Sequence, residues 1–131
     1  ISTAGQAFGH AAAKNTVAVA AVSVATAAGG VFSGGAANPV ATYSSDGPRR
    51  IFYGPNGAAV TPGNFSSTGG ELVQKPDIAA ADCVATSTPG FSPFCGTAAG
   101  APHAAAIAAL MLEAVLPGSF MFRNLGIPRL S

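Results

Sequence analysis

The segment with the clearest chemical potential runs from Gly96 to His103 and has the letters GTAAGAPH. It follows a loop that contains Pro89 and Pro93, and it opens an Ala-rich stretch that favours a helix. The first N–H groups of a helix have no intrahelical partner and carry a partial positive charge. Such groups can stabilise the oxyanion that forms when a carbonyl is attacked. The alternative is a tight strand-to-helix junction that only requires small side chains.

Cys83 and Cys95 are the only cysteines, and they bracket the loop that leads to Gly96. Their spacing suits a disulfide, which would stabilise the fold by about 2–3 kcal/mol; two buried free thiols are the alternative. An even cysteine count, few charges and many small polar residues favour a secreted or extracytoplasmic protein. Because no histidine or further cysteine lies nearby and the five carboxylates are scattered, we expect no metal site.

Charged residues make up only 8% of the 131 residues, and apolar residues make up 49%. Because globular proteins average about 25% charged residues, the composition indicates a buried portion of a larger domain. Six basic and five acidic side chains give no field for nucleic acid or an anionic membrane. The apolar run 16–28 is too short to span a bilayer, and the run 97–115 is interrupted by Pro102-His103 and carries Glu113. We therefore expect neither a nucleic-acid nor a membrane partner.

The elements expected around these residues mix strand and helix patterns. Continuous apolar runs and turn signals predict strands at 16–22, 40–44, 50–53 (with a hairpin turn at 55–57) and 76–80. Residues 60–70 have a loop composition. The helix after Gly96 is so poor in polar residues that we expect it to be buried nearly all round and to end at Pro117-Gly118. Residues 1–15 lack a signal-peptide pattern and Ile1 is not an initiator Met, so we expect the chain to begin inside a longer product.

Segment 96–103, with the AAAIAALML that follows it, resembles the nucleophile segment of subtilisin-like serine proteases (subtilases). The family's pattern is Gly-Thr-Ser, a variable residue, a small residue, another residue, Pro-His and an Ala/Gly-rich helix. Ala98 stands at the nucleophile position, and Gly100 stands where the family prefers Ser or Ala. The positions that match the pattern are Gly96, Thr97, Pro102 and His103.

Three further segments resemble the family in the same order along the chain. Residues 75–80 (KPDIAA) are similar to its KPDIAAPG strand, although Ala81-Asp82 replaces Pro-Gly. Residues 43–48 (YSSDGP) are similar to its Phe-Ser-Ser-x-Gly-Pro turn, and residues 15–22 lie where the family has a Val-Ile-Ala-Val-Gly-Ala strand. The resemblance implies a three-layer α/β fold, with a largely parallel sheet and helices on both faces. Residues 1–131 would form the C-terminal part of the peptidase domain.

The resemblance also implies that the parent protein hydrolyses peptide bonds through an acyl-enzyme, on peptide or protein substrates and without a cofactor. The chain as written is expected to be inactive because Ala98 has no nucleophilic atom. The triad Asp and His would lie before Ile1, so the N-terminal part of the same domain is an expected partner. His103 is expected to be a packing residue, and His10 has no motif around it. The acidic residues expected to be structural are Asp46, Asp77 and Asp82.

Several alternatives remain open at this point. Gln6, in Ala4-Gly5-Gln6, lies near the place of the family's oxyanion-hole Asn and could be a longer amide substitute for it, but a surface glutamine in a loop is the favoured interpretation. The loops 4–6 and 87–95 are predicted to line the substrate cleft. The substitution at Ala98 is either engineered or natural. A natural one would mark a pseudo-protease that binds peptides or partner domains without cleaving them, and the chain could also be a structural fragment that assembles with a separate N-terminal chain.

Overall fold

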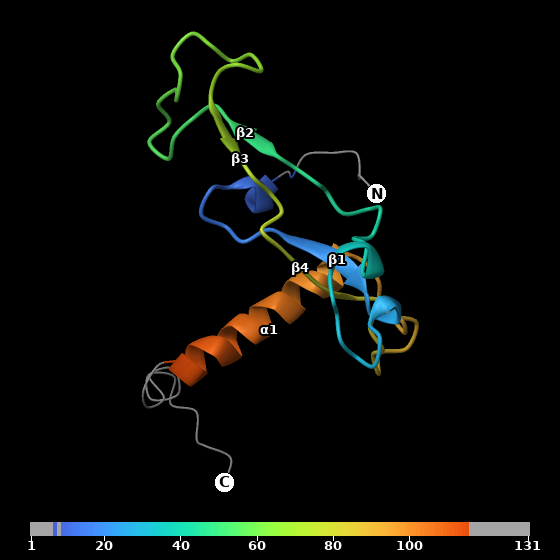
Figure 1. The fold of residues 1–131 in the computed structure, drawn as a ribbon. Helices are drawn as coiled ribbons and strands as arrows, with labels where there is room; N and C mark the ends of the chain where they lie inside the picture. Colours follow the sequence, from blue (N-terminus) through green and yellow to red (C-terminus); the bar gives the residue numbers. More distant parts are fainter. Residues whose placement is uncertain (1–6, 8, 116–131) are drawn as a thin grey trace.

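A computed structural model describes Ala7 and residues 9–115 of the chain. The described residues form four short strands and one long helix, joined by extended loops (Figure 1). The strands and the helix are β1 (Val19–Ser23), β2 (Arg49–Ile51), β3 (Glu71–Val73), β4 (Ile78–Asp82) and α1 (Thr97–Val115). Three short 3-10 turns lie at Gly9–Ala12, Val24–Thr26 and Gly35–Ala37.

The centre of the structure is a parallel pair of strands with α1 packed on it. Strand β1 pairs with β4 from Val19 opposite Ile78 to Ser23 opposite Asp82. The helix approaches this pair closely, since a Cβ at Gly100 would lie 3.4 Å from the carbonyl oxygen of Ala20. Such an approach favours a small residue at position 100 of the helix. The structure thus has mixed α/β content with a parallel pair, whereas the three-layer arrangement stays a prediction.

The two strands predicted at 16–22 and 76–80 are confirmed as β1, which begins three residues and ends one residue later than predicted, and β4, which lies two residues later at both ends. The strand predicted at 40–44 is wrong, because only Val40 forms a bridge, to Val22. The physical reason lies in Ser44, whose hydroxyl oxygen accepts the Ala21 N–H at 2.9 Å. The Ala21 N–H of β1 is thus bonded to a side chain, whereas a continuous strand at 40–44 would offer it a backbone carbonyl.

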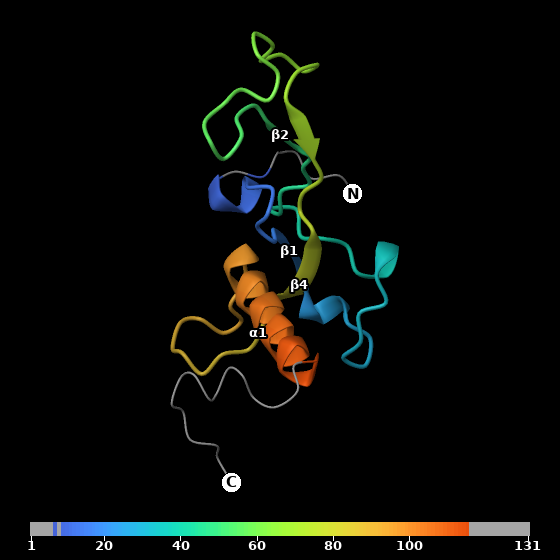
Figure 2. The ribbon, with the colours of Figure 1, turned by 90° about the vertical axis from the view of Figure 1, so that its left-hand side faces the viewer.

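Strands β2 and β3 form a separate antiparallel pair with Arg49 opposite Val73. The predicted turn at 55–57 closes through a bridge between Tyr53 and Ala59. However, the strand that pairs with β2 is β3, which follows the loop at 60–70. A strand at this place was not predicted. The loop between the two strands projects away from the end of the molecule that holds α1 (Figures 1 and 2).

The expectation that α1 is buried nearly all round is wrong for this structure, where only Ala99 and Gly100 are buried. Large apolar side chains on α1 are more than half exposed, namely Ile107, Leu110, Met111, Leu112 and Val115. The reason is that a helix is buried only where other elements cover it, and among the described residues the main contacts of α1 are with β1 and β4. Figure 1 shows the helix leaving this pair beyond its first turns.

The helix predicted after Gly96 is confirmed as α1, and it is continuous through Pro102. Proline at this position has no N–H to bond to the carbonyl of Ala98, and its ring crowds that carbonyl, yet helical geometry continues to Val115. With 19 residues and a mean hydropathy of 1.4, α1 is long and apolar enough to cross a membrane by length and composition. A core helix can meet the same criterion, and the absence of a membrane partner stays a prediction. The expected stop at Pro117-Gly118 lies outside the described residues.

Candidate functional site at the junction of β4 and α1

The candidate site lies where the carboxyl ends of β1 and β4 meet the first turn of α1. Ser23 and Asp82 are the last residues of the two strands and lie opposite each other in the sheet. In open parallel α/β sheets, ligands bind outside this end of the strands. The loop from Cys83 to Cys95 leaves β4 here and returns to start α1 at Thr97.

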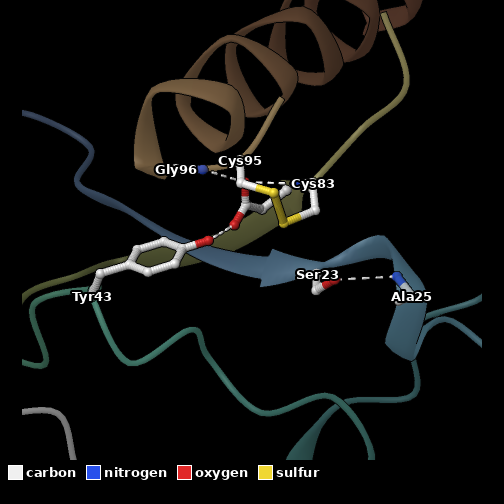
Figure 3. Close-up of a disulfide and its surroundings, with 7 residues drawn as sticks. Ser23, Ala25, Tyr43, Cys83, Cys95 and Gly96 are labelled. Atoms are coloured by element: carbon white, nitrogen blue, oxygen red, sulfur yellow. Dashed lines mark hydrogen bonds between the residues drawn. A yellow bond between two sulfur atoms is a disulfide. The ribbon is translucent and has the colours of Figure 1, made fainter. Parts of the chain in front are cut away.

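Asp82 is completely buried and organises this junction. Its Oδ1 accepts the N–H of Cys83 and the N–H of Gly96, both at 2.6 Å. Its Oδ2 accepts the hydroxyl of Tyr43. Figure 3 shows the Tyr43 hydroxyl, the Gly96 nitrogen and the two cysteines gathered at this point. One carboxylate therefore fixes both ends of the 83–95 loop.

The carboxylate of Asp82 is ionised despite its burial. Burial raises its pKa, but the hydrogen bonds from Tyr43, Cys83 and Gly96 together lower the pKa by more than burial raises it. The pKa of Asp82 therefore lies below the usual range. The same bond with Asp82 raises the pKa of Tyr43, so the shared proton stays on the phenol. The expectation that Asp82 is structural agrees with these bonds. Its contact with the first residue of the GTAAGAPH motif was missed.

The predicted disulfide between Cys83 and Cys95 is confirmed. Cys83 has a φ of 54°, in the left-handed region, so the chain turns sharply as it leaves β4. The two sulfurs and a carboxylate oxygen of Asp82 lie within 4.8 Å of one another. However, the sulfurs are bonded to each other and the carboxylate oxygens accept three hydrogen bonds. This set therefore forms the disulfide-linked turn, and we assign it no metal.

The side chain at position 98 is exposed at the start of α1, as is Thr97. The next residue, Ala99, is buried and donates its N–H to the carbonyl of Gly96 at 2.9 Å. This bond closes the first turn and directs positions 97 and 98 outward. A nucleophilic side chain at position 98 would thus be accessible beside the free N–H groups of the helix terminus, although Ala98 itself offers only a methyl group.

The two histidines differ in their surroundings. His103 is half-buried, and its Nδ1 lies 2.7 Å from the carbonyl oxygen of Ala99. Because a carbonyl only accepts, Nδ1 carries the proton, and this bond to the preceding turn suits the expected packing role. His10 is exposed in the turn Gly9–Ala12. Gln6 lies outside the described residues.

A second polar anchor joins the opposite ends of β1 and β4. Asp77 accepts the N–H of Ala18 and the ammonium of Lys75, each at 2.7 Å. The Lys75 side chain is almost fully buried and also donates to the carbonyl of Thr16. The hydrogen bond from Lys75, with that from Ala18, lowers the pKa of Asp77. The structural role expected for Asp77 agrees with these contacts.

Comparisons of the chain with protein-family models, with curated proteins and with solved structures find no match. The subtilase resemblance therefore rests on the four sequence segments alone, and the family stays a prediction.

The stability of the chain is expected to fall in acid. Folding lowers the pKa values of Asp77 and Asp82, whereas an unfolded Asp titrates near about 3.9. At a pH between the folded-state and unfolded-state pKa values, the unfolded chain binds more protons than the folded chain. The stabilisation is therefore fully present above about pH 5 and declines as the pH falls through about 4. Urea unfolding of the chain between pH 3 and pH 7 measures this slope. The variant Asp82→Asn should show a shallower slope, and equal slopes would contradict the assignment.

Proposed function

We propose that the chain is the nucleophile-bearing C-terminal part of a subtilisin-like serine endopeptidase domain, and that it is inactive as written because Ala98 stands at the nucleophile position. The N-terminal part of the domain would supply the Asp and His of the triad. The main support is that the four segments resembling the family lie in contact with one another, with position 98 exposed at the helix start.

The contacts between the segments are specific. The strand in 15–22 pairs with the strand in 75–80. Segment 43–48 meets both of them, because Ser44 bonds to the Ala21 N–H and Gly47 abuts the Lys75 carbonyl. Gly100, in 96–103, packs against carbonyls of both strands. Short motifs that matched by chance would have no reason to assemble in this way, so the convergence supports a common origin of the four resemblances.

The chemistry proposed for the parent requires a hydroxyl at position 98. That oxygen would attack the peptide carbonyl while a histidine takes its proton and an aspartate orients the histidine. N–H groups at the start of α1 would stabilise the oxyanion of the tetrahedral intermediate. The disulfide close to this point supports the proposal that the domain works outside the reducing cytoplasm.

The test is the substitution Ala98→Ser in the longer polypeptide that the proposal requires, followed by reaction with a fluorophosphonate probe. We expect covalent labelling at position 98, located by peptide mass spectrometry, and none in the unchanged protein. The matched control is Ala101→Ser, which places a hydroxyl at a nearby exposed position of α1 and should not react.

Two results would overturn the proposal. A natural polypeptide with no further segment carrying Asp and His would remove the triad. Absence of labelling in a folded Ala98→Ser variant would instead favour the pseudo-protease alternative, in which the Ala98 surface binds peptides or partner domains without cleaving them.

A further inference from the structure

The further inference concerns Asp82, whose carboxylate contacts the turn that precedes position 98. Gly96 has a φ of 130°, a conformation that side chains rarely permit, and its N–H is held at 2.6 Å by Asp82 Oδ1. The direction in which α1 begins depends on this residue, because helical geometry starts at Thr97. We propose that Asp82 is the positioning residue that fixes the Gly96 turn and, through it, the orientation of position 98.

The disulfide alone does not explain this arrangement. It links the side chains of Cys83 and Cys95, but the backbone dihedrals of Gly96 remain free to rotate beyond the linked residue. The bond from the Gly96 N–H to Asp82 removes that freedom. Since the same oxygen also accepts the Cys83 N–H, it ties the turn directly to the end of β4.

An apolar residue of similar size would not replace the carboxylate. An apolar side chain at position 82 would leave the N–H groups of Cys83 and Gly96 without an acceptor. Buried N–H groups that lack an acceptor lower the stability of the folded state. Asparagine keeps one oxygen that can accept both N–H groups, and the Tyr43 hydroxyl can rotate to accept from the new amide. Asp82→Asn is therefore the conservative variant that separates acceptor geometry from charge.

The consequence for reactivity rests on the proposed function. In the Ala98→Ser background of the longer polypeptide, Asp82→Ala is expected to lower the fluorophosphonate labelling rate about 100-fold, the effect of a displacement of about 1 Å. Asp82→Asn should stay within about tenfold of the parent, because neutral hydrogen bonds are roughly half as strong. The loss should lie in the maximal labelling rate rather than in the concentration of probe that gives half of that rate.

The matched control is Asp77→Ala. Asp77 is also a carboxylate beside β4, and it also accepts a backbone N–H, but it lies at the opposite end of the strand. Its removal should lower the thermal midpoint and leave the labelling rate of the folded protein unchanged. This control distinguishes positioning from general loss of stability.

A second readout does not depend on the proposed function. Amide hydrogen exchange in the 131-residue chain should accelerate at Gly96 and Ala99 in Asp82→Ala, because the Gly96 N–H is bonded to Asp82 and the Ala99 N–H to the carbonyl of Gly96, while the Ala18 amide stays protected. Asp77→Ala should give the opposite pattern. If Asp82→Ala does not fold, Tyr43→Phe tests the same idea, because it removes only the hydroxyl bonded to Oδ2 and should accelerate exchange at Gly96 more than at Ala18.

The outcomes separate the two proposals. Absence of labelling in Ala98→Ser overturns the proposed function, while the exchange pattern still decides the role of Asp82. Unchanged exchange at Gly96 and Ala99 in Asp82→Ala, or at Gly96 in Tyr43→Phe where that variant is used, overturns the positioning role. A labelling rate in Asp82→Ala equal to that of its parent overturns it as well.

Discussion

Replacement of Gly47 by alanine is expected to destabilise the fold by about 3 kcal/mol or more. A Cβ at this position would lie 1.6 Å from the carbonyl oxygen of Lys75 and 2.7 Å from the carbonyl carbon. Both are backbone atoms, so relief requires a shift of the segment that starts β4. That segment also carries the buried Lys75 side chain and its bond to Asp77. Urea unfolding followed by circular dichroism measures the loss.

The matched control is Gly57→Ala. Gly57 also has a positive φ, 77°, but no described atom lies within 4 Å of the place its Cβ would take. Only the cost of the left-handed conformation remains, about 1–2 kcal/mol. A loss for Gly57→Ala as large as that for Gly47→Ala would show that backbone conformation, not contact with Lys75, dominates at both sites.

The size of the Gly47 effect follows from how the described part of the chain is held together. Its buried apolar residues are mostly alanines, namely Ala7, Ala12, Ala18, Ala20, Ala21, Val22 and Ala99. Such small side chains bury little apolar area, so much of the cohesion comes from close backbone approach and from the anchors at Asp77 and Asp82. An added methyl group at a point of backbone contact therefore disturbs the structure at its tightest place.

Local patterns were sufficient to predict some elements but not others. The β-branched and Ala-rich runs around β1 and β4, and the helix-forming residues of α1, depend on neighbouring residues, and these elements were found. Strand β3 was missed because it has three residues and pairs with a strand about 20 positions earlier. The error at 40–44 arose because the Ser44 hydroxyl bonds to β1, which a β-propensity pattern does not describe.

The same distinction applies to the candidate site. The Cys83–Cys95 disulfide followed from the cysteine count and spacing, and position 98 was singled out by its motif. The role of Asp82 could not be found in that way, because its partners lie 14 positions later, at Gly96, and 39 positions earlier, at Tyr43. The only local signal was an acidic residue at the end of an apolar run. That signal indicates a structural residue, not the partner it holds.

Removal of the disulfide is expected to destabilise the chain by about 3 kcal/mol, which is more than 100-fold in the folding equilibrium. Cys83 and Cys95 close a loop of about a dozen residues, and opening it returns conformational freedom to the unfolded chain. The double variant Cys83→Ala with Cys95→Ala tests this, because both substitutions keep the backbone N–H groups that bond to Asp82. The unfolding free energy in urea gives the result.

Reduction of the unchanged protein provides the control for this variant. With an excess of a phosphine reductant, its unfolding free energy should fall to that of the double variant, which should itself not respond to the reductant. Because the bonds from Cys83 and Gly96 to Asp82 do not involve sulfur, the acid dependence of stability should persist in both cases. A reduced protein as stable as the oxidised one would mean that Asp82, rather than the disulfide, holds the loop closed.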